Sequence, residues 1–303
     1  MKILISDTTR DFGSGFRVVF DSLDSFQTKC EDIEYDFSQC GFINPSFLLP
    51  LVALKGSSVY SNRIIIKNST FSNRVSSYLD TIHFPDAYAT ANMSEQELEK
   101  FLSTYSGKSY VPIICFPGTN SNADATKRDM VIGSIGDLLA ESLKLNPNAH
   151  SVIMMLLSEL TNNIGDHADI NKGYIVAQHF AGNHYLDICI ADCGMGILKA
   201  FQTEKPALGL QTSDQAIERA VRGESTKQDA IGRGFGLSGS IEMLRSLGGQ
   251  FILCSGDSSF VSRTSLPGGI VNTPNGISWP GCWVLIRVTT RIPAGFNYLK
   301  FYS

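Results

Sequence analysis

The sequence lacks the marks of several protein classes. No apolar run is long enough to cross a bilayer, and the first residues, MKILISDTTR, lack the long apolar core of a signal peptide. No two cysteines form a CxxC pair, so we expect no zinc cage. We therefore expect a cytoplasmic protein, not bound to a membrane, with reduced thiols. The seven cysteines are Cys30, Cys40, Cys115, Cys189, Cys193, Cys254 and Cys282.

Charge is also scarce, at 18% of residues, and the formal net charge is -4. This balance argues against general nucleic-acid binding, which needs a basic surface. Hydrophobic residues make up 43% of the 303 residues, enough for a full core, and the length suggests about two domains. Strand-like and helix-like runs alternate along the chain, which predicts an α/β or α+β fold.

The first part of the chain has a strand–helix pattern. Asn44 and Pro45 mark a helix start, because asparagine caps the first turn and proline loses no backbone bond there. Pro50 predicts that this helix is weakened or kinked. The spacing predicts strands at 33–38 and 61–68 and helices at 44–56 and 71–84.

A linker is expected at Thr104–Tyr110, after a short helix that Ser94 and Glu97 begin as a capping box. A buried strand at Val111–Pro117 and a long helix at Thr126–Leu145 follow it. We place the boundary at residue 107, which predicts domains 1–107 and 108–303.

The segment Ser151–Ile170 has helical spacing, with an apolar stripe beside a polar one that contains Glu159, Asn163, Asp166 and His167. Glu159 could act as a general base on a water attacking a terminal phosphate. Asn163 offers an amide oxygen to Mg²⁺, and His167 could lie near phosphate. The alternative is a solvated polar face on an amphipathic helix.

The second motif is ADCGMGI, which follows the strand-like YLDICI. Asp192 continues the inward side of that strand, where its carboxylate could accept a hydrogen bond from an exocyclic amine and so favour adenine over guanine. Gly194 and Gly196, followed by Ile197, allow a tight turn close to a flat base. The alternative is an ordinary turn after a strand.

The third motif, GRGFGLSGS, joins a glycine-rich loop to a helix that ends at Gly248. Such a helix start exposes backbone N–H groups to anions, and a flexible connection is the alternative. The residues expected to contact nucleotide here are Arg233, Gly234, Phe235, Gly236 and Leu237. A polar loop with Thr226 and Lys227 precedes them, after a short helix that Ser213 is expected to cap, and could form a cationic lid over phosphates.

Other nucleotide motifs do not fit. A dinucleotide-binding fold places its glycines before the acidic residue, whereas Asp192 comes before the third motif. The sequence contains no GxxxxGK[ST] loop.

The three motifs, ELTNN…HA, DCGMGI and GRGFGL, resemble in order and spacing the N, G1 and G2 boxes of the GHKL ATPases. This superfamily includes gyrase, Hsp90, histidine kinases and MutL, and ESTK before the third motif looks closest to histidine kinases and anti-sigma serine kinases. The resemblance covers about 111–291 and implies a Bergerat-type α/β sandwich: a mixed sheet with helices on one face and Mg-ATP between helices and lid.

The resemblance also implies roles for single residues. Glu159 resembles the base, Asn163 the Mg²⁺ ligand and Asp192 the adenine reader. The glycines Gly194, Gly196, Gly234 and Gly236 resemble the backbone contacts. Relatives often carry a threonine where this chain has Cys282, and a thiol is a weak hydrogen-bond partner for adenine.

The segment YDFSQCGFINPSFLLPLVAL resembles the strand–helix signature of STAS domains, which predicts a smaller α/β STAS-like domain before the ATP-binding one. STAS partners of serine kinases carry a phosphorylatable serine at this helix start, for which Ser38 and Ser46 are the candidates. A helix cap is the alternative role for Ser46.

A sensor histidine kinase is not expected, because none of the five histidines lies in an H-E/D-x-x-T-P helix. Three functions remain open. They are an ATP-hydrolysing switch that acts on a protein partner, a serine/threonine kinase acting on a STAS-like partner or on its own first domain, and a non-catalytic nucleotide-binding module. Several members of the superfamily dimerise, so a homodimer is one state the resemblance allows.

Overall fold

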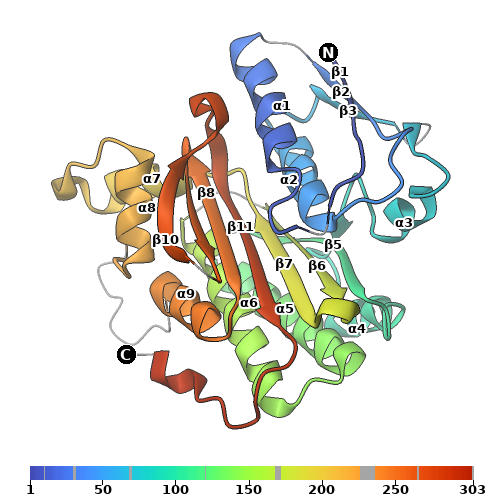
Figure 1. Ribbon diagram of the computed structural model, residues 1–303, viewed down its shortest axis with the longest axis vertical. Coiled ribbons are helices and arrows are strands. Elements are labelled where there is room, and N and C mark those ends of the chain that lie inside the picture. Colours follow the sequence, from blue (N-terminus) through green and yellow to red (C-terminus); the bar gives the residue numbers. More distant parts are fainter. Residues whose placement is uncertain are drawn as a thin grey trace.

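The structure is a computed structural model that describes residues 1–9, 11–29, 32–67, 70–119, 121–167, 172–225, 236–264 and 266–301 (Figure 1). It is a mixed α/β fold with two sheets. The small sheet is parallel, in the order β1-β2-β3. Its strands are β1 (Lys2–Leu4), β2 (Ile33–Asp36) and β3 (Ile64–Ile66).

The large sheet is mixed, with the order β10-β9-β8-β11-β7-β6-β5-β4. Only β4 and β5 pair in parallel, and every other neighbouring pair is antiparallel. Its strands are β4 (Tyr88–Ala89), β5 (Tyr110–Pro117), β6 (Lys172–Phe180), β7 (Tyr185–Ala191), β8 (Gln250–Gly256), β9 (Ser258–Arg263), β10 (Leu266–Asn272) and β11 (Trp279–Thr289).

Helices α1 (Phe16–Thr28) and α2 (Pro45–Gly56) lie between the two sheets (Figure 1). One core cluster contains side chains from these helices and from both sheets. Phe16 of α1 stacks on Trp283 of β11 with ring centroids 3.8 Å apart. The small sheet and its helices thereby pack on one face of the large sheet, which buries apolar area from both parts.

Helix α2 is apolar on all sides, and every residue from Pro45 to Leu54 is buried. A helix with no polar face is stable only where it is covered all round, as it is between two sheets. Asn44 caps it as predicted, because its side chain accepts the Ser46 N–H at 3.0 Å. The helix continues through Pro50 to Gly56.

The other face of the large sheet carries a second core cluster and a layer of helices. The capping box predicted for α4 is confirmed, since Ser94 and Glu97 exchange both hydrogen bonds. The helices of this layer are α4 (Glu95–Ser103), α5 (Asn122–Leu143), α6 (Pro147–His167) and α9 (Gly236–Ser246). The short helices α7 (Gly196–Glu204) and α8 (Ser213–Val221) pack on each other near β8 and β9.

Three predicted helices differ in extent from the observed ones. Helix α3 covers only Ser76–Thr81. The Ser72 hydroxyl, before the helix, donates to the backbone oxygen of Cys40, and His83, after it, has a left-handed φ of +64°. Helix α5 begins four residues earlier than predicted, with Ser121 as its cap. Ser213, the predicted cap of α8, is instead its first helical residue, and the cap is Thr212.

The predicted linker at 104–110 is tied to the helices beside it. The Tyr105 hydroxyl donates to the Thr81 oxygen at 2.7 Å, and the Gly107 N–H donates to the Ser142 hydroxyl at 3.1 Å. Both β4 and α4 precede residue 107 and belong to the large sheet and its core. The change from one sheet to the other thus falls between β3 and β4, and the boundary at 107 stays a prediction.

Among the helices that the structure describes, none combines the length and the apolar character that a membrane span requires.

Candidate functional site

Asp192 lies at the carboxyl end of β7, on the face of the large sheet that the α5–α6 layer covers. The strand alternates, so that Ile188 and Ile190 pack in the core beneath those helices while Cys189 and Ala191 face α2. Asp192 continues the Ile190 side, as the sequence predicted. The residue is only 1% exposed.

Both carboxylate oxygens of Asp192 accept backbone hydrogen bonds. The Gly194 N–H donates to Oδ1 at 2.7 Å, and the Cys282 N–H donates to Oδ2 at 3.2 Å. The backbone N–H of Asp192 donates in turn to the Cys282 oxygen at 2.8 Å. The strand β11 and the turn after β7 therefore fix the orientation of the carboxylate.

Burial raises the pKa of Asp192 to about 7, and the N–H groups of Gly194 and Cys282 act in the opposite direction. The removal of water disfavours the charged form, whereas hydrogen bonds to the carboxylate favour it. At neutral pH the group is therefore divided between its neutral and ionised forms. Strongly perturbed buried acids of this kind are concentrated at functional sites.

Cys282 lies beside Asp192 on β11. Its thiol is 3.8 Å from the Ser255 hydroxyl. Burial, with the nearby Asp192, raises the pKa of the Cys282 thiol well above its ordinary value, so the thiol is neutral at physiological pH.

Ser255 is a site residue that the sequence analysis missed. It is buried at the end of β8, accepts the Ile197 N–H at 2.9 Å and donates to the Gly281 oxygen at 2.8 Å. The start of α7 is thus tied to β8 and β11 through one hydroxyl. The Trp279 indole N–H adds a 3.2 Å hydrogen bond to the backbone oxygen of Asp192.

Gly281 allows the close approach of β11 to Asp192. Its φ is +90°, in the left-handed region, and a side chain there would overlap Asp192 Oδ1 and the Gly194 nitrogen. The pairing register of β11 with β8 shifts between Trp279 and Trp283, around this residue. A glycine inside a strand-like segment is the sequence signal for such a close approach, and the sequence analysis did not use it.

The turn after β7 connects that strand to α7, a helix that the sequence analysis did not predict. Gly196 has φ +74° and begins α7, with Ile197 as its second residue. The N–H groups of Gly194 and Ile197 are used within the protein, by Asp192 and Ser255.

Helix α6 carries Glu159 and Asn163, one turn apart and both half-buried. The predicted apolar stripe is confirmed, because its four residues are buried in the core between the helix and the large sheet: Ile153, Leu156, Leu160 and Ile164. Helix α6 also contacts α7 and α9, the helices that begin at the second and third motifs. His167 is the last residue of α6, and its side chain lies outside the described part of the structure.

A buried arginine positions the second half of α6, and the sequence analysis missed it as well. Arg128 of α5 is 2% exposed, and its Nε donates to Asn162 Oδ1 at 3.1 Å. One terminal nitrogen donates to the Thr119 oxygen at 3.0 Å. Arg128 therefore links α6, next to Asn163, to the loop after β5.

The third motif falls mostly outside the described residues. The predicted contacts Thr226, Lys227, Arg233, Gly234 and Phe235 all lie in 226–235, of which nothing is described. Gly236 and Leu237 begin α9, and Leu237 packs at the edge of the second core. Before this gap, the Arg222 guanidinium pairs with Glu218 at 2.6 Å.

The described residues contain no group of three or more histidine, cysteine, aspartate or glutamate side chains that could hold a metal. A magnesium ion bound through Asn163, water and phosphate oxygens would not need such a group.

The structure thus brings the second motif, Glu159 and Asn163 of α6 and the start of α9 to one face of one sheet. Comparisons with protein-family models, with curated proteins and with solved structures found no match to this chain.

Proposed function

We propose that this chain binds Mg-ATP and hydrolyses it, as a nucleotide-dependent switch of the GHKL type acting on a protein partner. The observation that carries the proposal is Asp192: a buried carboxylate of raised pKa at the end of a sheet strand, on the same face as α6. In this proposal the large sheet, with α5, α6 and α9, is a Bergerat-type sandwich, and the small sheet with α1 and α2 is the STAS-like part.

Each residue has a separate chemical task in this proposal. The exocyclic amine of adenine donates to Asp192, whereas guanine would place a carbonyl against the carboxylate. Asn163 gives an oxygen to Mg²⁺, and Glu159 takes the proton of the attacking water. The residues 226–235 and the start of α9 enclose the phosphates.

The burial of Asp192 favours a switch over a static site. Asp192 as a whole residue is 1% exposed, so adenine can reach its carboxylate only after the atoms that cover it move. Nucleotide binding and a change of conformation are then the same event. A ligand that binds one of two conformations better shifts the population toward it, which changes the surface a partner sees.

The second candidate is a serine/threonine kinase that acts on a STAS-like partner or on the first domain of the same chain. The structure distinguishes the two candidate serines within the chain. Ser38 is exposed after β2, whereas Ser46 is 4% exposed at the start of α2, with its hydroxyl bound to Asn44 Oδ1 at 2.8 Å. Self-phosphorylation without unfolding would therefore use Ser38. The third candidate is a module that binds nucleotide without chemistry.

Incubation with γ-labelled Mg-ATP separates the three candidates. The proposal predicts free labelled phosphate, reduced about a hundredfold or more in Glu159→Ala because a general base contributes that much. Glu99→Ala, an exposed glutamate on α4, is the matched control and should behave as wild type. Label on the protein would instead favour the kinase, and bound but unreacted ATP would favour the non-catalytic module.

A further inference from the structure

The start of β11 lies directly against Asp192. The Cys282 N–H donates to Asp192 Oδ2 at 3.2 Å, and a side chain at Gly281 would overlap Oδ1. The Trp279 indole N–H donates to the backbone oxygen of Asp192 at 3.2 Å. Residues 278–282, which we call the cover segment, therefore belong to the cover that adenine has to displace.

The cover segment is the irregular part of β11. The pairing of β11 with β8 shifts register between Trp279 and Trp283, and its pairing with β7 begins at Trp283. Pro280, in between, has no backbone N–H to donate to a neighbouring strand. Backbone outside a regular ladder opens at a lower free-energy cost than backbone within it. The cover segment can thus move while the rest of β11 stays paired.

Helix α1 holds the first residue of the cover segment. The Gln27 side-chain amide exchanges two hydrogen bonds with the backbone of Ser278. Its nitrogen donates to the Ser278 oxygen at 2.8 Å, and its oxygen accepts the Ser278 N–H at 3.4 Å. Helix α1 also contacts the 3₁₀ helix η4 (Pro274–Gly276), just before the cover segment. One end of the cover segment is therefore tied to the small sheet and its helices.

Aromatic rings connect α1 to the other end of the cover segment, where α1 lies beside the start of β11 (Figure 1). Phe16 of α1 stacks on Trp283 with ring centroids 3.8 Å apart, and the Trp283 and Trp279 rings are 5.4 Å apart. Both tryptophans are buried. Because buried side chains are close-packed and compress little, a shift of α1 displaces the rings that pack on it.

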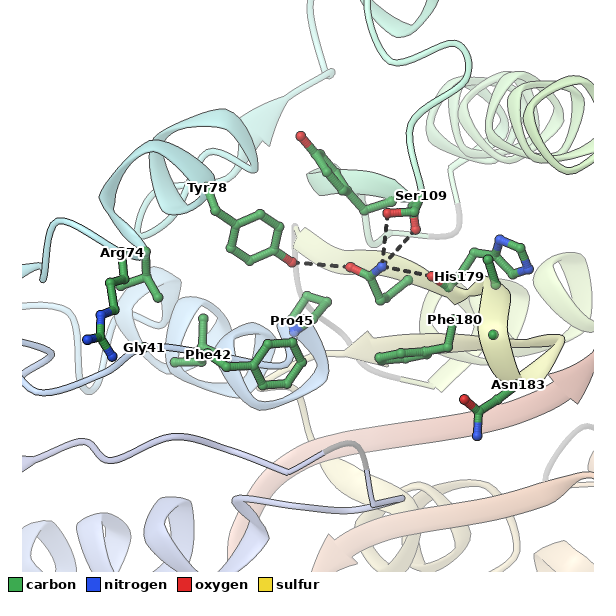
Figure 2. Close-up of a pocket in the computed structure, with 15 residues that line it drawn as sticks. Gly41, Phe42, Pro45, Arg74, Tyr78, Ser109, His179, Phe180 and Asn183 are labelled. Carbon is green, nitrogen blue, oxygen red and sulfur yellow. Dashed lines mark hydrogen bonds between the residues drawn. The ribbon is translucent and has the colours of Figure 1, made fainter.

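The small sheet and its helices have room to shift against the large sheet. At the end of the large sheet opposite to Asp192, a cavity of about 460 Å³ lies between the loop before α2 and the hairpin that joins β6 and β7. Phe42 of that loop and Phe180 of β6 lie on its two sides (Figure 2). Interiors are otherwise close-packed, so a space of this size lets one part move against the other without overlap.

We propose that α1 controls the access of nucleotide to Asp192 through the cover segment. The inference rests on the proposed nucleotide site and adds its regulation. In the described conformation Gln27 holds the cover segment closed, and a shift of α1 opens it. Because such coupling is reciprocal, nucleotide binding also changes the contact between α1 and β11. A protein partner that moves α1 would therefore change the affinity for nucleotide.

Gln27→Ala tests the proposal in the full chain. The substitution removes both hydrogen bonds to Ser278, and Gln27 is exposed, so the fold should be kept. We expect the variant to bind Mg-ATP about three- to tenfold more tightly than wild type in calorimetry, because the lost hydrogen bonds raise the fraction of molecules with an open cover segment. A merely structural role of Gln27 would leave the affinity unchanged or weaken it.

Tryptophan fluorescence reports on the cover segment without a label, because Trp279 and Trp283 are the only two tryptophans in the sequence. Saturating Mg-ATP should change the emission spectrum of wild type. Gln27→Ala should show part of that change before ATP is added.

Gln96→Ala, an exposed glutamine on α4, is the matched control and should bind Mg-ATP as wild type does. Thermal unfolding of each variant shows whether the fold is kept. Suppose wild type binds Mg-ATP, but folded Gln27→Ala binds it no more tightly than Gln96→Ala, or saturating Mg-ATP leaves the emission of wild type unchanged. Control by α1 is then overturned while the nucleotide site stands. If wild type binds no adenine nucleotide, the nucleotide site is wrong and the proposed control of it is overturned as well.

Discussion

At the scale of single residues, Asp192 should make stability depend on pH. Its folded pKa of about 7 lies above the ordinary value of about 3.9, so between these values the folded protein binds more protons than the unfolded chain. The stabilisation that protonated Asp192 gives the folded state is fully present below about pH 4 and is lost as the pH rises through 7. Between pH 5 and pH 8, the free energy of unfolding measured in urea should therefore fall more for wild type than for Asp192→Asn. An equal loss in both proteins would contradict the raised pKa.

Gly281 gives a second prediction at this scale. Gly281→Ala should lower the free energy of unfolding by about 1–3 kcal/mol and displace the Asp192 carboxylate, because the residue combines φ +90° with contact to Asp192. Gly276→Ala is the control, since Gly276 has φ +65° but no atom near its missing side chain. Chemical unfolding and ATP binding measure both effects. If Gly276→Ala impairs ATP binding as much as Gly281→Ala, the contact with Asp192 is not the cause.

At the scale of elements, α2 should not tolerate charge at its start. Ser46→Asp places a carboxylate in a buried site beside Asn44 Oδ1, itself an acceptor, and should cost about 3 kcal/mol or more. Ser38→Asp, in an exposed turn, should change the unfolding free energy by less than about 0.5 kcal/mol. Urea unfolding compares them, with Ser46→Ala to account for the lost hydroxyl. Equal stability of the two aspartate variants would show that α2 is not buried as described.

Local patterns predicted several elements well. The alternation of Leu186, Ile188 and Ile190 placed Asp192 on the correct face, and the spacing of Ser94 and Glu97 gave the start of α4. Tertiary contacts decided what the patterns missed. Ser72, in the segment predicted to begin α3, instead donates a hydrogen bond to Cys40, 32 residues away, and no local pattern contains that contact.

In the candidate site, too, local patterns indicated some residues and tertiary contacts determined the others. Motif order indicated Asp192, Glu159 and Asn163, each on its own element. Ser255, Gly281 and Arg128 act through contacts between elements distant in sequence, so spacing alone could not show them. The resemblance gave a sheet with helices on one face. In this chain the other face is covered as well, by α1 and α2.

At the scale of the whole molecule, the two parts should not be independent. The face of the large sheet toward α1 and α2 contributes Trp283, Tyr174 and Leu285 to the shared core. Residues 108–303 alone would expose that face and also lack β4. We expect this fragment to aggregate or to bind a hydrophobic dye strongly, unlike the full chain. A soluble, monomeric fragment that does not bind the dye would instead support independent domains on either side of residue 107.

The most direct test of the account is calorimetric titration of the full chain with Mg-ATP and Mg-GTP. We expect wild type to bind ATP and not GTP, and folded Asp192→Asn to bind ATP at least about tenfold more weakly, the effect of one hydrogen bond to a charged group. Asp129→Asn, an exposed aspartate on α5, should bind as wild type does. If wild type binds no adenine nucleotide, or if Asp192→Asn binds ATP as tightly as Asp129→Asn, the proposed nucleotide site is wrong.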